Sequence, residues 1–230
     1  MNTHVAHGAP TAAEQAIAKE NVVVGDEVVR HRLSSRVIHW AVAASFMLLL
    51  VTGMPIWSPI FGWMAALVGG LEVCRWLHPW TGIFFSATSL VMFFRWLGEM
   101  KLERNERAWL GPKMIEYFKF RGTDPDVGKY NGGQKIFFFL VSLASLVLLL
   151  TGFVLWFPLN FARGLREVSL LLHDASFIFF FVAIVFHIYL GTAAEPGTFR
   201  AMTRGTVTRA WARHHHPRWY RDVTGGERRR

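Results

Sequence analysis

Four histidines of the 230-residue chain lie inside or at the ends of long apolar stretches, namely His39, His78, His173 and His187. An ionisable side chain is costly in hydrocarbon, so such a residue normally faces a partner or a cavity. Neutral imidazole is also the commonest metal ligand among side chains. For each histidine alone, a hydrogen bond to a backbone carbonyl of a neighbouring helix is an equal alternative. The four together favour a functional interpretation, because their depths match in pairs.

The apolar stretches that must position these histidines are long enough to cross a membrane. At about 1.5 Å per residue, a helix of about 20 residues spans a hydrocarbon core of about 30 Å. A soluble core helix is usually shorter and polar on one side. The sequence therefore predicts an all-α integral membrane protein, a bundle of four transmembrane helices. The predicted spans are residues 37–57, 78–96, 136–157 and 169–190.

The basic residues are distributed unevenly between the two sides of such a bundle. Of the 25 Lys and Arg residues, 22 lie before the first span, between the second and third spans, or after the fourth. The other two connections hold only Arg75, Arg163 and Arg166. Because cytoplasmic connections carry the excess of Lys and Arg, both termini are predicted to be cytoplasmic. Membrane topology thus explains the net charge of +9, and no nucleic-acid partner is expected.

This orientation gives each histidine a depth in the membrane. His39 and His187 lie near the cytoplasmic face, whereas His78 and His173 lie near the opposite, periplasmic face. His173 and His187 are 14 residues apart, which places them on nearly the same helix face and about 21 Å apart along its axis. We therefore predict two haem b groups, with each haem iron held by one histidine pair. Ligation by two imidazoles suits electron transfer rather than oxygen binding.

The predicted organisation has three parts. Residues 1–36 form a soluble cytoplasmic N-terminal tail, residues 37–191 the four-helix dihaem cytochrome b domain, and residues 192–230 a basic cytoplasmic C-terminal tail. The single cysteine, Cys74, excludes a thiolate cluster within the chain, and no Cys-x-x-Cys-His run is present for a covalently attached haem. Any iron–sulfur cluster must therefore belong to a partner chain.

Several sequence runs together form a specific signature that extends from about Arg30 to Asp222. They are RVIHW around His39, WLHPWTGI around His78, DVGKYNGGQK at residues 126–135, LLLHD ending at Asp174, IVFHIYL around His187 and HHPRWYRD near the C-terminus. In this order and spacing, the chain resembles the gamma subunit, a cytochrome b, of membrane-bound respiratory formate dehydrogenase.

The resemblance implies the same two haem-ligand pairs and a place in a larger respiratory complex of the bacterial inner (plasma) membrane. Formate would be oxidised in a molybdenum- or tungsten-containing alpha subunit, and the electrons would cross an iron–sulfur beta subunit. They would reach the haem of His78 and His173 first, and then that of His39 and His187. Menaquinone or ubiquinone would be reduced at the cytoplasmic side. Membrane lipid surrounds such a subunit, and a trimer of complexes is a further expectation.

A quinone pocket is implied at the cytoplasmic end of the third span. In the family, the residues that correspond to Asn131, Gly133 and Gln134 form this pocket together with the region of His187. Their place in the sequence agrees, because they directly precede a span that begins at the same depth as His39 and His187. An amide and backbone donors at a helix start are able to hold a quinone carbonyl. On the residues alone, a simple turn with Gln134 as a helix cap is an equal alternative.

Two other functions remain open at the level of the sequence. The cytochrome b subunit of a nickel–iron hydrogenase or thiosulfate reductase shares the four-helix, two-haem plan, and the electron donor lies in a different chain. A haem-free transporter with histidines along a proton path is the second alternative. The spans lack the acidic residues that are usual in proton relays, Asp174 excepted.

Three surface features have less specific interpretations. Residues 108–120 mix aromatic, aliphatic and basic side chains, which predicts an amphipathic helix at the headgroups or against a partner subunit. The consecutive His214, His215 and His216 are interpreted as part of a solvated or interfacial basic segment rather than as a metal site. Asp174, which follows a predicted haem ligand, is expected to face interfacial water.

Overall fold

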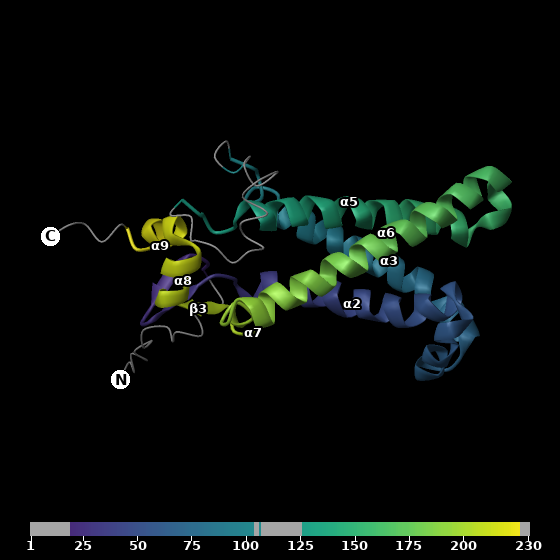
Figure 1. Ribbon diagram of the computed structural model, residues 1–230, viewed down its shortest axis with the longest axis horizontal. Coiled ribbons are helices and arrows are strands. Elements are labelled where there is room, and N and C mark those ends of the chain that lie inside the picture. The colour runs from purple at the N-terminus through teal and green to yellow at the C-terminus, as the bar shows by residue number, and fades with distance from the viewer. Residues whose placement is uncertain (1–18, 104–105, 107–125, 226–230) are drawn as a thin grey trace, which may run out of the picture. The chain divides into compact units, whose positions relative to one another are not determined.

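The computed structural model describes residues 19–103, 106 and 126–225 of the chain. Four long helices run side by side, as Figure 1 shows. They are α2 (Leu33–Trp57), α3 (Leu71–Trp96), α5 (Gly132–Trp156) and α6 (Arg163–Tyr189). Among the described residues, these four helices are long and apolar enough to cross a membrane. The predicted fold class, a helical membrane bundle, is confirmed.

Each helix begins before the span that hydropathy predicts. α3 starts at Leu71, so His78 lies about two turns inside the helix rather than at its start. The reason is that hydropathy detects only the apolar part of a helix, whereas the backbone hydrogen bonds continue into its polar ends. Pro55 and Pro79 lie within α2 and α3, and a transmembrane helix tolerates proline where neighbouring groups satisfy the freed carbonyl. The predicted amphipathic helix at residues 108–120 lies outside the described residues.

The four helices of the bundle stand well apart. Closely packed helices have axes about 8–10 Å apart. Among the described residues, Cα atoms of different long helices come within 8 Å of one another only at isolated points. Within the most apolar window of each helix, 11% to 28% of the residues are buried in the protein. Most apolar side chains of these helices are therefore available to lipid or to a group held between the helices.

A small apolar cluster joins the four helices near the middle of the bundle. Phe46 of α2, Phe85 of α3 and Phe180 of α6 meet with ring centroids 4.9 to 6.4 Å apart. Val141 and Ala144 complete the cluster from α5. Phe180 is equally distant in sequence from His173 and His187, so the cluster separates the levels of the two α6 histidines.

Shorter elements connect the helices and follow them. In chain order they are the 3-10 helices η1 (Pro59–Val68) and η3 (Pro158–Asn160), the π-helix η4 (Leu190–Ala194), and the α-helices α7 (Arg200–Thr203), α8 (Arg209–His215) and α9 (Pro217–Val223).

The described residues form two compact units. The bundle unit comprises Ile38–Leu102 and Gly133–Tyr189, and the sheet unit comprises the described parts of Met1–Val37, Glu103–Gly132 and Leu190–Arg230. The sheet unit is named for an antiparallel three-stranded sheet of order β1-β2-β3. The strands are β1 (Val22–Val24), β2 (Glu27–Val29) and β3 (Thr206–Thr208).

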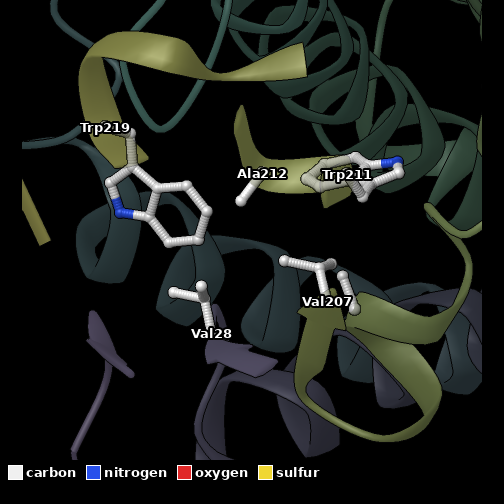
Figure 2. Close-up of a cluster of buried hydrophobic side chains, with 6 residues drawn as sticks. Val28, Val207, Trp211, Ala212 and Trp219 are labelled. Atoms are coloured by element: carbon white, nitrogen blue, oxygen red, sulfur yellow. The ribbon is translucent and has the colours of Figure 1, made fainter. Parts of the chain in front are cut away.

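The sheet joins the N-terminal and C-terminal segments, which were predicted to be separate tails. Val28 pairs with Val207 in the register of β2 and β3. Both are buried against Trp211, Ala212 and Trp219 of α8 and α9, and Figure 2 shows these side chains converging. The two segments therefore share one apolar core.

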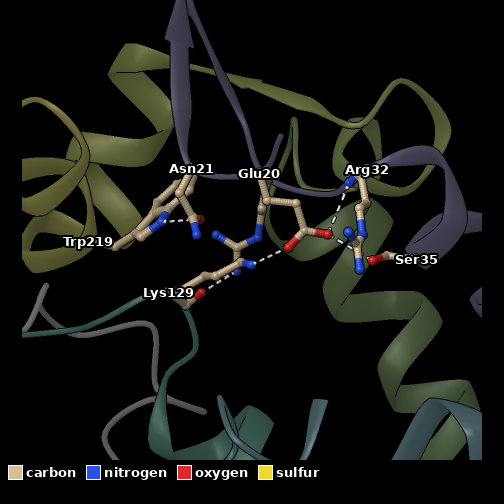
Figure 3. A network of polar contacts seen from close by, with 7 residues as sticks. Glu20, Asn21, Arg32, Ser35, Lys129 and Trp219 are labelled. Atoms are coloured by element: carbon tan, nitrogen blue, oxygen red, sulfur yellow. Dashed lines mark hydrogen bonds and ion pairs between the residues drawn. The ribbon is translucent and has the colours of Figure 1, made fainter. Parts of the chain in front are cut away.

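A polar network lies beside that core, and Figure 3 shows its members. Glu20 accepts hydrogen bonds from Lys129 Nζ at 2.8 Å, Ser35 Oγ at 2.7 Å and the backbone N–H of Arg32 at 3.1 Å. Both side chains of the Glu20–Lys129 pair are about nine-tenths buried. Burial alone raises the pKa of Glu20, but the hydrogen bond and charge of Lys129, with the other donors, outweigh it and hold that pKa below its usual value.

His216 corrects the interpretation of the histidine run. Its side chain is 2% exposed, and its Nδ1 donates to the backbone carbonyl of Gly128 at 2.7 Å. The prediction of a solvated segment is wrong for this residue, because α8 ends just before it and turns it into the core of the sheet unit. His214 is exposed.

Candidate haem-binding site

The four membrane histidines come together as the two predicted pairs. The imidazole centroids of His39 and His187 are 6.1 Å apart, and those of His78 and His173 are 6.5 Å apart. A metal–imidazole bond is about 2 Å long, as at zinc sites, and the ring centre lies about 1 Å behind the bonding nitrogen. Two imidazoles on opposite sides of one metal ion therefore have centres about 6 Å apart. Both pairs fit a six-coordinate haem iron, with one imidazole on each axial side.

The helix α6 contributes one histidine to each pair. His173 and His187 both lie on α6, His39 is supplied by α2 and His78 by α3. The spacing of 14 residues along α6 separates the two levels by about 21 Å. Since the cluster around Phe180 occupies the space between these levels, the two sites are distinct.

The rings of His78 and His173 are each held by a threonine. Thr52 Oγ1 lies 3.1 Å from His78 Nδ1, and Thr151 Oγ1 lies 2.9 Å from His173 Nδ1. These threonines lie on α2 and α5, so each contact crosses between two helices. The hydroxyl groups restrict how either imidazole is able to turn about its side-chain bonds.

Two glycines directly follow these threonines and allow the rings to approach the backbone. A Cβ atom on Gly53 would lie 2.8 Å from Cε1 of His78, closer than real Cβ atoms come to other groups. A Cβ atom on Gly152 would lie 3.3 Å from Cε1 of His173, which is also tight. Glycine is therefore required at position 53 for the observed position of the His78 ring. At position 152, the His173 ring leaves little room for any side chain.

The second pair has aromatic rather than hydroxyl neighbours. The ring of Phe137 on α5 stacks on His187 with centroids 5.1 Å apart and an interplanar angle of 9°. Trp40 meets His39 edge to face at 5.4 Å. In the part of the chain that is described, Nδ1 of His39 is buried without a hydrogen-bond partner. An unpartnered imidazole nitrogen in apolar surroundings suits a metal ligand.

The predicted quinone residues lie at the start of α5. Gly133 and Gln134 are in its first turn, and Asn131 directly precedes it. Asn131 belongs to the sheet unit, whereas Gly133, Gln134 and His187 belong to the bundle unit. The pocket that these four residues are expected to form stays a prediction. The next residue of the same turn, Lys135, is 4% exposed and donates from Nζ to the carbonyl of Lys101 at 3.1 Å.

Asp174 contacts a neighbouring helix. Its Oδ2 accepts a hydrogen bond from the indole N–H of Trp57 at 3.2 Å, which joins the end of α2 to α6. The carboxylate thus has a protein donor, and the expectation that it also faces interfacial water stays a prediction.

Three neighbours of the histidines were not identified from the sequence, namely Thr52, Thr151 and Phe137. A signal for the threonines is present, because Leu-Leu-Leu-Val-Thr-Gly at residues 48–53 recurs as Val-Leu-Leu-Leu-Thr-Gly at residues 147–152. Phe137 has no such signal, since one phenylalanine among several in an apolar helix is indistinguishable from ordinary packing.

Comparisons with known proteins show which family model and which relatives the chain matches. The prokaryotic cytochrome b561 family matches residues 30–205. The formate dehydrogenase cytochrome b556(fdo) subunit of Escherichia coli strain K12 is 34% identical over 201 residues, which cover 86% of this chain and 94% of that protein. The cytochrome b556 subunit from Haemophilus influenzae is 36% identical over 203 residues, 85% and 83% of the two chains.

A third relative has a more specific name. The nitrate-inducible formate dehydrogenase cytochrome b556(Fdn) subunit of Escherichia coli strain K12 is 34% identical over 206 residues, 87% of this chain and 93% of that protein. The resemblance predicted from the motif runs is confirmed.

Proposed function

The chain belongs to the prokaryotic cytochrome b561 family, and we propose that it is the dihaem cytochrome b subunit of a formate dehydrogenase complex. The observation that carries the proposal is the pairing of four histidines into two ring pairs, 6.1 and 6.5 Å between centroids, at two levels of one bundle. The names of the relatives point to formate as the source of electrons.

The residues of the chain position two one-electron carriers. Haem b, when bound, supplies an iron that exchanges one electron between its ferric and ferrous states. His39 and His187 would hold the iron of one haem through their imidazoles, and His78 and His173 would hold that of the other. With two imidazoles on each iron, no position would be left for oxygen, so each site would carry electrons rather than activate a substrate.

The direction of electron flow follows from the proposed orientation. The excess of Lys and Arg in the termini and the long connection places the His39–His187 level near the cytoplasm. Electrons would enter at the His78–His173 level from an iron–sulfur partner subunit, since this chain has only one cysteine. Formate itself would be oxidised in a further subunit that holds molybdenum or tungsten.

Quinone reduction is proposed at the cytoplasmic level. Asn131, Gly133 and Gln134 at the start of α5 would bind a quinone carbonyl through an amide and backbone N–H groups, with His187 nearby in the bundle. The buried Lys135 lies in the same turn and adds positive charge there. The setting is the bacterial inner membrane, where lipid surrounds the apolar helix faces.

Haem quantitation combined with a reduced-minus-oxidised spectrum tests the proposal. We expect about two b haems per chain in the purified complex. His78→Ala and His173→Ala should each remove one and the same haem, and His39→Ala should remove the other together with quinone reduction. A protein without haem, or with one haem that survives all three substitutions, would contradict the proposed sites.

The electron donor is tested by purification of the chain with its native partners. The complex should reduce its b haems when formate is added and leave them oxidised under hydrogen. Hydrogen uptake without formate oxidation would instead identify a hydrogenase cytochrome b.

The quinone site is tested separately with Asn131→Ala and Gln134→Ala. Both haems should still be reduced by formate, but quinol formation should fall at least tenfold. Unchanged quinol formation in both variants would place the quinone elsewhere.

A further inference from the structure

The hydroxyl groups of Thr52 and Thr151 distinguish one histidine pair from the other. They contact Nδ1 of His78 and of His173 at 3.1 and 2.9 Å. In the other pair, Nδ1 of His39 is buried without a hydrogen-bond partner among the described residues. The two levels of the bundle therefore differ in how their imidazoles are oriented and polarised.

The direction of these hydrogen bonds follows from the backbone around each threonine. Thr52 Oγ1 lies 2.8 Å from the carbonyl oxygen of Leu48, and Thr151 Oγ1 lies 2.6 Å from that of Val147. A carbonyl oxygen only accepts, so the single hydroxyl hydrogen is donated to it in both cases. The threonine oxygen is then left to accept, and the histidine Nδ1 must carry the donated hydrogen.

The tautomer of both rings follows from this assignment. In a neutral imidazole only one nitrogen carries hydrogen. With Nδ1 protonated, Nε2 holds the lone pair that a metal ion requires.

We propose that Thr52 and Thr151 are positioning residues that hold His78 and His173 as Nε2 ligands and lower the midpoint potential of their haem. The inference rests on the proposed function. A hydrogen-bond acceptor on the far nitrogen of a ligating histidine fixes its tautomer and raises its basicity. A more basic ligand stabilises ferric over ferrous iron, so removal of the acceptor raises the potential.

The recurrence of the Thr-Gly dipeptide supports a shared role. In α2 and in α5, the threonine contacts Nδ1 of a histidine and the following glycine lies against Cε1 of the same ring. Two different helices thus present the same two groups to two different histidines. By contrast, the hydroxyl of Thr88 on α3 bonds carbonyls of its own helix, that of Phe84 at 2.9 Å and that of Phe85 at 3.0 Å.

The test is a redox titration of the two b haems in the purified complex, together with the electron paramagnetic resonance signals of the ferric haems. Thr52→Val and Thr151→Val keep the shape of the side chain and remove the acceptor. We expect each to raise the potential of the same haem and to shift its ferric signal, with additive shifts in the double variant. Thr88→Val, which removes a hydroxyl that bonds backbone carbonyls of its own helix, should leave both potentials unchanged.

Conservative variants separate hydrogen bonding from packing. If Thr→Val removes a haem and Thr→Ser restores it, the hydroxyl positions the ligand, as proposed. If both substitutions remove the haem, or if the double Val variant keeps both potentials and both signals, the inference is wrong. A wild-type complex that lacks two b haems would contradict the proposed function itself, so the two failures are distinguishable.

Discussion

At the scale of single residues, Gly53 shows how closely the bundle approaches a histidine ring. Its Cα faces Cε1 of His78, and an added Cβ would lie 2.8 Å from that atom. Because the contact is to the ring that would bind iron, the space at this glycine determines where the ligand lies.

Gly53→Ala should therefore displace His78 and weaken the haem at this level. We expect loss of about half of the b haem, or a shifted spectrum of one component, measured per chain by haem extraction. Gly82→Ala is the matched control on α3, since its added Cβ would meet Leu49 at 4.0 Å, an ordinary contact. Equal haem content in both variants would contradict the steric argument.

His216 gives a second expectation at this scale, because its environment disfavours protonation. Burial, and then the charge of Arg30, lower the pKa of His216 well below its usual value. An unfolded histidine has a pKa of about 6.5. As the pH falls below that value, the unfolded chain binds a proton that the folded sheet unit excludes, so the stability of the unit decreases.

The protection of β2 and β3 against hydrogen exchange in the complete protein, after correction for the intrinsic exchange rate at each pH, should thus fall between about pH 7.5 and pH 5.5, the range in which an unfolded histidine titrates. His216→Asn keeps a donor for the Gly128 carbonyl and should reduce this loss of protection. His215, whose pKa burial also lowers, accounts for part of the remainder. His214→Asn alters an exposed side chain and serves as the control.

At the scale of the elements, the cluster around Phe180 is the main contact among widely spaced helices. Phe180 is 3% exposed and touches Phe46 and Phe85. Replacing a buried phenylalanine with alanine costs about 3–5 kcal/mol in soluble cores through lost contacts and a cavity.

Phe180→Ala should lower the temperature at which the haem-loaded protein unfolds in detergent and release both haems together. Phe179→Ala, at an adjacent position that is 44% exposed, should have little effect. The absorbance of the haem b bands during heating measures both the unfolding temperature and the release of haem. If the two variants unfold alike, the cluster does not hold the helices together.

The elements also show what the sequence was able to predict. Runs of apolar residues are sufficient to identify α2, α3, α5 and α6, because a membrane requires continuous hydrophobicity. Counting residues along α6 is sufficient to match His173 and His187 with partners at two depths. The contacts of Thr52 and Thr151 were not predictable from the sequence, because these residues resemble any small polar residue of a helix until the position of the neighbouring histidine ring is known.

The sheet unit was missed for a related reason. Its strands are three residues long, and although β1 pairs with the neighbouring β2, β2 pairs with β3, which follows all four long helices. Strands this short have no periodicity to detect, and pairing between distant segments leaves no local signal. Glu20, a charged residue of the predicted N-terminal tail, is instead buried in an ion pair with Lys129 of the long connection.

At the scale of the whole molecule, that buried pair links the N-terminal segment to the residues that precede α5. Removing one partner of a buried ion pair costs about 3–5 kcal/mol, because the other charge stays in a poorly solvated place. Since the pKa of Glu20 is lowered, the contribution of this carboxylate is present at neutral pH and is lost as acid protonates it.

Glu20→Gln should make β1 and β2 more susceptible to proteolysis in the intact protein, while the haem content of the bundle stays unchanged. Glu72→Gln is the control, since its ion pair with Arg75 is largely exposed and such pairs contribute little. Identical cleavage of the two variants would show that the Glu20 network does not stabilise the sheet unit.

The order of the strands also has a consequence for how the protein is made. β2 is synthesised before any of the four long helices, but its partner β3 is synthesised only after the last of them. The hairpin of β1 and β2 must therefore wait for its third strand while the membrane helices are inserted. Completion of the sheet is a late event of biogenesis, so a ribosome that stops after α6 would release a chain with its helices present and its N-terminal strands open to proteases.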